Sequence, residues 1–294
     1  MENSDYLKNL NENQLEAVKT IDGPVMVFAG AGTGKTRTLI SRIVYMIKEC
    51  NIQPYHILAI TFTKKATNEM RERLEKQIES KAKFVHISTI HSLCANILRR
   101  NATYLDYGRN FEVIDEEDQV KILNEIYKKS EINRRVLSPK VAIKAIGDFK
   151  NKSCLELVGL LKTVYNEYQT FLKENNMMDF EDLLVLTYQL FKENPNILEY
   201  YQDEFKYILV DELQDTNVVQ YDIINLLCQK YENIFAVGDD DQSIYSFRGA
   251  KIENMMKFKE DHPKAKIIKL VENYRSTNMI LKGSNAVIKN NKIS

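Results

Sequence analysis

A glycine-rich turn between an apolar run and a helical pattern constrains this chain more than any other feature. The apolar residues 25–29 are followed by the turn Gly30-Ala31-Gly32-Thr33-Gly34-Lys35-Thr36, and aliphatic residues then recur at helical spacing over 39–47. This order predicts a strand, a loop and a helix. Glycines let backbone N–H groups turn inward on a phosphate, and the helix N-terminus adds partial positive charge. The turn therefore predicts a nucleoside triphosphate site.

The residue types in this turn predict separate roles in binding ATP. The backbone of Ala31, Gly32, Thr33 and Gly34 would surround the phosphates, and Lys35 would reach the outer ones. The hydroxyl of Thr36 would bind Mg²⁺. The strict pattern has glycine at position 29, where this chain has alanine. That position closes the strand, so we expect a methyl group to be tolerated there.

Composition bounds the class of protein. A length of 294 residues suggests about two domains. Lys plus Arg and Asp plus Glu are both 41, so a nucleic-acid partner would be held by local patches and stacking and not by an overall basic field. The four cysteines lack metal-site spacing and predict reduced thiols, with no zinc. Without a signal peptide or an apolar run of about 18 residues, we expect a cytoplasmic protein with no membrane partner.

Strand–helix alternation continues after the turn. A strand is predicted over 56–62 and a helix over 66–78, with Thr63, Lys64 and Lys65 at its N-terminus, where phosphate is favoured. A second such unit has a strand over 84–89 and a helix over 92–100. The alternation predicts an α/β fold, a parallel sheet covered by helices on both faces.

Helical patterns alone fill residues 106–178, which we predict to be an all-helical insertion between strands. Three stripes of apolar residues are predicted to face its core, namely Val120, Leu123 and Tyr127, then Val141, Ala145 and Phe149, then Val158, Leu161, Tyr165, Tyr168 and Leu172. Asp179 and Asp182 are predicted to be the cap and first-turn charge of a helix over 179–190. The ATP-binding domain is accordingly assigned to 1–105 and 179–276.

An apolar strand predicted over 207–212 ends in two carboxylates. Downstream of a phosphate-binding turn, Asp211 would hold the water shell of Mg²⁺, and Glu212 would deprotonate an attacking water. The alternative is a pair of solvated acids at a strand end. Gln242 follows a strand predicted over 233–238, and its neutral amide is suited to contact a γ-phosphate.

Several residues have two interpretations from the residues alone. Gln14 follows Asn11 by three positions, which favours a capping box over contact with an adenine edge. His91 at a turn is more often a packing or capping residue than a ligand. Tyr245, Phe247 and Arg248 combine aromatic faces with a cation, which is typical of single-strand binding, although both aromatics could be core residues.

Taken together, the motifs resemble superfamily-1 DNA helicases of the UvrD/PcrA/Rep family, in that family's order and over nearly the whole chain. They are Leu-Asn-x-x-Gln (10–14), the glycine-rich turn (29–36), Thr-Phe-Thr-Lys-Lys-Ala (61–66), Thr-Ile-His-Ser (89–92), Phe-x-Val-x-Asp-x-x-Asp-Gln (111–119), Asp-Phe-Glu-Asp-Leu-Leu (179–184), Val-Asp-Glu-Leu-Gln-Asp-Thr-Asn (210–217), Gly-Asp-x-x-Gln-Ser-Ile-Tyr (238–245) and Asn-Tyr-Arg-Ser (273–276). Lys64, Ile90, Leu213 and Phe247 depart from the family's usual Asn, aromatic, aromatic and Trp.

The resemblance implies an ATP- and Mg²⁺-dependent helicase that moves 3′ to 5′ on single-stranded DNA, acts at duplex junctions, and serves DNA repair or replication. It implies that Gln14 reads adenine, that Arg37 and Tyr274 sandwich the ring, and that Arg275 contacts the γ-phosphate. The implied DNA track comprises Phe62, Thr63, Lys64, His91, Tyr245, Phe247 and Arg248.

The family's second motor domain would begin near residue 277, and the chain ends at Ser294. We therefore expect residues 277–294 to be the start of that domain, and the chain to be an N-terminal fragment with weak or no activity of its own. Two other functional classes remain open from the residues. They are a P-loop kinase of a small molecule, and a nucleotide-gated binding module without turnover.

Overall fold

The computed structural model describes residues 6–239 and 253–274, which divide into two compact units. The first unit comprises Met1–Ile90, Leu198–Thr216 and Ile224–Ser294, and the second comprises His91–Ile197 and Asn217–Ile223. The helical insertion predicted over 106–178 falls inside the second unit, and its boundaries stay a prediction. Helices α4 (Ile90–Asn101), α9 (Pro195–Glu204) and α10 (Val218–Cys228) each run across a unit boundary.

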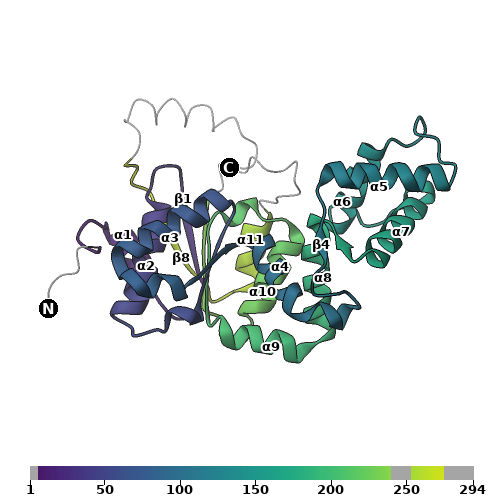
Figure 1. Cartoon of the computed structure of the whole chain (residues 1–294). Coiled ribbons are helices and arrows are strands. Elements are labelled where there is room, and N and C mark those ends of the chain that lie inside the picture. The colour runs from purple at the N-terminus through teal and green to yellow at the C-terminus, as the bar shows by residue number, and fades with distance from the viewer. Residues whose placement is uncertain (1–5, 240–252, 275–294) are drawn as a thin grey trace, which may run out of the picture. The chain divides into compact units, whose positions relative to one another are not determined.

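A parallel sheet of six strands, counted over the described residues, forms the centre of the first unit (Figure 1). Its strands lie in the order β3-β2-β6-β7-β1-β8, and every neighbouring pair is parallel. Buried strands with near-continuous apolar sequence are typical of such sheets. The strands are β1 (Val25–Ala29), β2 (Ile57–Thr61), β3 (His86–Thr89), β6 (Tyr207–Val210), β7 (Ile234–Gly238) and β8 (Lys266–Leu270).

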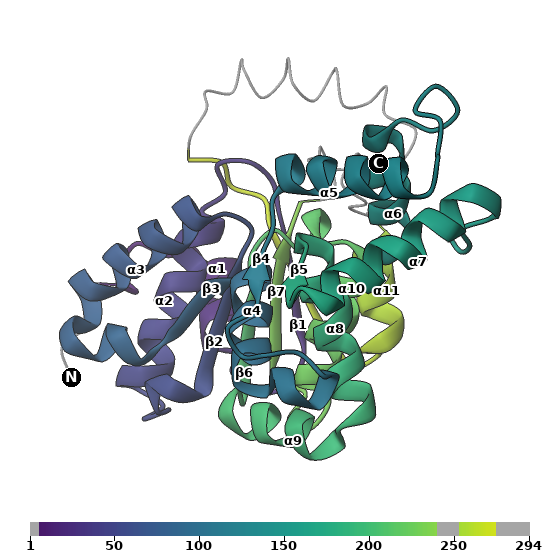
Figure 2. The ribbon, with the colours of Figure 1, turned by 45° about the vertical axis from the view of Figure 1, so that its right-hand side comes forward.

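Helices cover both faces of this sheet, as the α/β prediction required. Figures 1 and 2 show α1 (Glu12–Lys19), α2 (Lys35–Lys48) and α3 (Lys64–Ile78) on one side of the strands and α11 (Glu253–Asp261) on the other. Short 3₁₀ helices occupy Pro54–His56 (η1), Glu79–Phe84 (η2) and Leu213–Asp215 (η4). No helix within the described ranges is long and apolar enough to cross a membrane.

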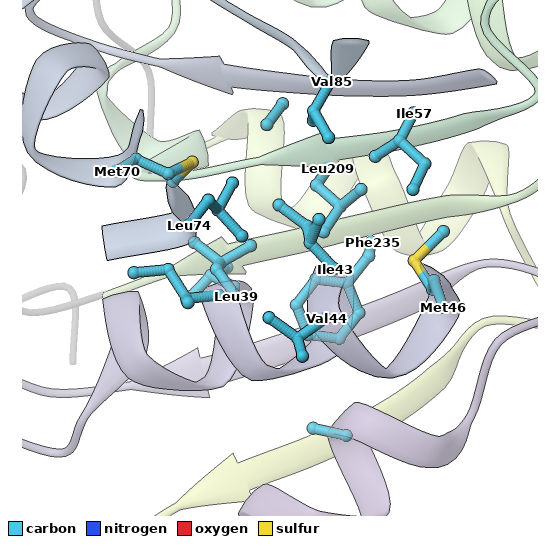
Figure 3. Close-up of a cluster of buried hydrophobic side chains, with 14 of the residues drawn as sticks. Leu39, Ile43, Val44, Met46, Ile57, Met70, Leu74, Val85, Leu209 and Phe235 are labelled. Carbon is cyan, nitrogen blue, oxygen red and sulfur yellow. The ribbon is translucent and has the colours of Figure 1, made fainter. Parts of the chain in front are cut away.

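The predicted apolar faces of α2 and α3 form the core of the first unit (Figure 3). Leu39 and Ile43 of α2 and Leu74 of α3 are almost fully buried, and they pack with Leu209 of β6 and Phe235 of β7. Burial of each such side chain stabilises the fold by roughly 1.5–3 kcal/mol. This core fixes the start of α2, where the phosphate-binding turn ends.

The second unit is mostly helical, with a two-stranded parallel ladder of β4 (Glu112–Val113) and β5 (Met177–Met178). Its helices include α5 (Glu116–Lys129), α6 (Pro139–Lys150), α7 (Gly159–Glu174) and α8 (Phe180–Glu193), with a 3₁₀ helix, η3, at Ala102–Leu105. Side chains from α5, α6 and α7 share one apolar core. Asp179 is the N-cap of α8 and forms a capping box with Asp182, as predicted.

Two predicted core stripes of this unit were partly wrong. On α6 the buried positions are Ala142, Ile146 and Lys150, so the stripe through Val141, Ala145 and Phe149 is one residue out, and Val141 is 57% exposed. The apolar pattern did not include the third buried position because it is a lysine, Lys150, which is paired inside with Asp179 and Asp182. On α7, Tyr168 and Leu172 are buried as predicted, whereas the N-cap Val158 is 65% exposed.

Candidate nucleotide site at the end of strand β1

The turn after β1 has a left-handed backbone at two of its glycines. Gly32 and Gly34 adopt φ of 79° and 86°, a region that residues with a Cβ rarely occupy. Thr33 stabilises the turn by donating from its hydroxyl to the Gly30 carbonyl, 2.7 Å away. Helix α2 then begins at Lys35, with Gly34 as its N-cap and no capping side chain. The N–H groups at this helix start are therefore left for an anion.

Gln14 packs directly against this turn. Its side chain completes the predicted capping box with Asn11, and its Nε2 also donates to the Thr33 carbonyl, 2.9 Å away. The residue has no exposed surface, and a Cβ on Gly34 would lie 2.7 Å from Nε2. Gln14 thus stabilises the turn through its hydrogen bond to the Thr33 carbonyl. The predicted contact with adenine requires this amide to turn outward.

Arg42 fixes α1 beside α2. Its buried guanidinium donates to the carbonyls of Ala17, Thr20 and Ile21, at and just beyond the end of α1, and lies 4.2 Å from the centre of the Phe235 ring. Burial lowers the pKa of Arg42 to about 9, with the charge of Asp22 acting in the opposite direction. With Gln14 bound to the turn and Arg42 bound to the carbonyls beyond the helix end, α1 is held at both of its ends.

The residues after β8 return to the same turn. The backbone N–H of Tyr274 donates to the Gly32 carbonyl, 2.9 Å away, and the side chain of Asn273 donates to the Ala31 carbonyl. The Tyr274 hydroxyl accepts from Asn11 at 2.9 Å, and its ring is 57% exposed. Arg37 is also exposed and acts electrostatically on Tyr274. The two predicted adenine-stacking residues therefore lie at one edge of the turn.

The predicted acid pair follows β6, which ends at Val210, two residues earlier than predicted. The backbone N–H of Asp211 continues the ladder to Ile60. Glu212 adopts the left-handed conformation, φ 54° and ψ 52°, which is rare for a residue with a side chain and occurs at functional sites. Its Oε2 accepts from Lys35 Nζ at 2.8 Å. The lysine predicted to bind phosphate and the predicted base are thus in direct contact.

Burial controls the ionisation of the neighbouring aspartates. Burial, reinforced by the charge of Glu212, raises the pKa of Asp211 to about 7 against the opposing effect of Lys35. Burial and Glu212 likewise raise the pKa of Asp215 to about 6. A bound cation would reverse both effects.

The donor set fits Mg²⁺. Asp215 Oδ1 is buried with no hydrogen-bond partner in the part of the chain that the structure describes, which leaves an acceptor for a cation-bound water. Those same residues contain no group of three or more His, Cys, Asp or Glu side chains placed to hold a metal. Mg²⁺ usually keeps several waters and takes one or two carboxylates plus substrate phosphates, which suits this site.

Replacing Asp211 by Asn should stabilise the chain when nucleotide and Mg²⁺ are absent. Because the folded chain binds the Asp211 proton more tightly than the unfolded chain does, this group lowers the free energy of unfolding as pH rises from about 4 to 7. We expect the free energy of unfolding of Asp211→Asn to exceed that of the unsubstituted chain by on the order of 1 kcal/mol at pH 8. The difference between the two chains should be smaller at pH 5. Urea titrations at both pH values measure this, and equal differences would contradict it.

The predicted DNA-contacting residues are only partly described. Phe62, Thr63 and Lys64 lie together where β2 ends and α3 begins, with Thr63 as the helix N-cap. His91, in the second unit, packs edge-on against Phe180 with ring centres 6.0 Å apart. Five predicted site residues lie outside the described residues, namely Gln242, Tyr245, Phe247, Arg248 and Arg275.

Sequence reasoning missed three polar residues of the site. Gln214 and Asp215 belong to η4, directly after Glu212, and Asn273 reaches the turn from beyond β8. The available signal was a run of polar residues, 214–217, between a buried strand and an apolar helix. Buried polar side chains are usually hydrogen-bonded, and the partners of Gln214, Thr216 and Asn217 lie outside the run itself.

Comparison with known proteins gives consistent matches. Residues 10–263 match the family model described as the UvrD/REP helicase N-terminal domain. The chain is 45% identical over 295 aligned residues to proteins named ATP-dependent DNA helicase PcrA from Staphylococcus aureus (strain Mu50) and Staphylococcus epidermidis (strain RP62A). Each alignment covers 97% of this chain and 40% of the relative. The chain thus spans about two fifths of the length of these curated relatives.

Proposed function

The chain belongs to the UvrD/REP helicase family, and on that premise we propose that it binds ATP·Mg²⁺ and couples ATP hydrolysis to 3′-to-5′ movement on single-stranded DNA. The observation that carries this proposal is the 2.8 Å contact between Lys35 at the start of α2 and Glu212 after β6. This contact supports the proposal because a cation suited to bind phosphate lies beside a carboxylate suited to accept a proton. A cytoplasmic location follows from the DNA substrate, and duplex junctions are the proposed site of unwinding.

The chemistry assigned to the site divides among the chain's own residues. Backbone N–H groups of the turn and Lys35 bind the phosphates, while Arg37 and Tyr274 hold the base between them. Thr36 and Asp211 would hold Mg²⁺, which supplies positive charge to the phosphates when bound. Glu212 accepts a proton from the attacking water, whose oxygen then bonds to the γ-phosphorus as ADP departs. Gln242 and Arg275 are proposed to contact the γ-phosphate.

Replacing Lys35 by Ala tests the nucleotide site. The lost charge-assisted contact should weaken ATP·Mg²⁺ binding by about 1.5–3 kcal/mol, or roughly 10- to 150-fold. Isothermal titration calorimetry measures the change. Lys48→Ala, in the last turn of the same helix, is the matched control and should bind as the unsubstituted chain does. Equal affinity in the Lys35 and Lys48 variants would refute the proposed site.

Replacing Phe62 by Ala tests the DNA track. Loss of a stacking face should weaken binding to an oligothymidine by about 1–3 kcal/mol, with little dependence on base sequence. Fluorescence anisotropy measures the affinity, and ATP binding should stay unchanged. Phe84→Ala removes a 53% exposed ring elsewhere in the same unit and serves as the control. If both variants bind DNA alike, Phe62 does not belong to the track.

A further inference from the structure

Gln214 bridges the proposed base and the end of a neighbouring strand. Its Nε2 donates to Glu212 Oε2 at 2.8 Å, and its Oε1 accepts from the backbone N–H of Asp239 at 3.0 Å. The side chain is almost fully buried, with 1% of its surface exposed. A buried amide that uses both its donor and its acceptor is fixed in one orientation, because leaving either unpaired is costly.

The bridge acts on the same oxygen that Lys35 contacts. Lys35 Nζ and Gln214 Nε2 both donate to Glu212 Oε2 at 2.8 Å. When nucleotide phosphates engage Lys35, the Glu212 carboxylate loses that partner and keeps Gln214. Glu212 also has a left-handed backbone, which is disfavoured unless surrounding contacts hold it. Gln214 is therefore placed to hold the carboxylate when ATP is bound.

A second contact ties the same turn to α11. The Asn254 side chain, 2% exposed, donates to the Thr216 carbonyl at 2.8 Å and to the Thr216 hydroxyl at 3.1 Å. Asp239 is the residue that directly precedes residues 240–252 in the sequence, and Asn254 comes just after them. The turn that carries Glu212 is thus hydrogen-bonded to the chain on both sides of that segment in the sequence.

We propose that Gln214 is a positioning residue, which orients the Glu212 carboxylate for proton transfer and links its placement to the end of β7. The inference rests on the proposed function, because it assumes that Glu212 serves ATP hydrolysis. Gln214 itself touches neither the water nor the phosphate. Its effect passes through Glu212, and removing Glu212 should abolish it.

A double-mutant cycle tests this dependence. Gln214→Met keeps the length of the side chain and removes both hydrogen bonds. In single-turnover hydrolysis by the complete enzyme with single-stranded DNA present, we expect the rate to fall about 10- to 100-fold while ATP affinity stays unchanged. The rate should not fall further when Gln214→Met is added to Glu212→Gln. Gln202→Met is the matched control, because Gln202 is also buried and donates to the Leu226 carbonyl at 2.7 Å.

Hydrolysis and hydrogen exchange at the Asp239 amide report separately on the two hydrogen bonds of Gln214, one to Glu212 and one from Asp239. Gln214→Glu keeps the acceptor for Asp239 and removes the donor to Glu212, so it should lose hydrolysis while the Asp239 amide stays protected from hydrogen exchange. Gln214→Met should lose both. Exchange is measured on the nucleotide-free chain, so it reports on the bridge even without turnover.

The outcomes are distinct. Additive effects of Gln214→Met and Glu212→Gln on the hydrolysis rate, or equal hydrolysis rates in the Gln214→Met and Gln202→Met variants, would overturn the positioning role. Asp239 exchange that is no faster in Gln214→Met than in Gln202→Met would overturn the bridge. Failure of the unsubstituted chain to bind ATP·Mg²⁺ would instead refute the proposed function, and exchange at Asp239 would still decide whether the bridge exists.

Discussion

Replacing Glu212 by Gln is expected to leave ATP bound and to slow its hydrolysis at least ~10²-fold. The amide keeps the shape of the carboxylate and can still accept hydrogen bonds from Lys35 and Gln214, but it cannot take a proton from water. Removing a negative charge beside the phosphates should also hold or increase ATP affinity. Single-turnover hydrolysis by the complete enzyme, in excess over ATP, measures the rate, and calorimetry measures binding.

Glu232→Gln is the control for this substitution. Glu232 is also left-handed, with φ 55°, but it is exposed and lies in the turn before β7, away from the phosphate-binding turn. Its variant should hydrolyse ATP at the unsubstituted rate. Surviving hydrolysis in Glu212→Gln would mean that another group activates the water.

Replacing Lys150 by Met should destabilise the chain by about 3–5 kcal/mol, because it removes the cation from a buried ion cluster. Lys150 Nζ lies 2.6 Å from Asp179 and 2.7 Å from Asp182, and each of the three side chains is at most 3% exposed. Tyr168 donates to Asp179 as well. Burial alone would lower the pKa of Lys150, but the two carboxylates outweigh it and hold that pKa above its ordinary value.

Urea unfolding measures the loss, and Lys121→Met is the control. Lys121 pairs with Asp118 at 2.7 Å on an exposed helix face, where such pairs contribute about 0.3–0.5 kcal/mol. Burial raises the pKa of Asp182 to about 7 against the opposing charge of Lys150. Losing Lys150 removes that opposition, so the folded variant binds this proton still more tightly than its unfolded form does. The loss should therefore be smaller at pH 5 than at pH 8. Similar losses in both variants would show that the cluster contributes no more than a surface pair.

The sequence pattern was sufficient to predict those elements that depend on residues close together in the chain. The apolar stripe of α2 and the buried strand β1 follow directly from periodicity, and the intervening turn follows from its glycines. The caps at Thr63 and Asp179 were also predictable, because a capping side chain bonds backbone only three residues away. The parallel sheet with helices on both faces follows from the alternation of these elements.

Long-range polar contacts could not be predicted from the sequence. Lys150 is buried on α6 because Asp179 and Asp182, at the start of α8, pair with it, and a stripe of apolar residues alone does not include it. Similarly, Gln214 binds Asp239 across the ends of β6 and β7, a contact that exists only once the strands pair. The roles assigned to Gln14, Arg37 and Tyr274 toward adenine stay predictions, although all three lie around the turn.

The register of strand β1 has a consequence for biosynthesis. Val25 pairs with Phe235 on one side and Lys266 on the other, so both neighbours of the phosphate-binding strand are translated long after it. At about 5–20 residues per second, a ribosome needs roughly 12–48 s to supply both of them. During that interval an apolar strand stays without either partner, the kind of segment that chaperones protect. The turn proposed to bind nucleotide is therefore encoded near the start of the message, but the strands on both sides of it are made much later.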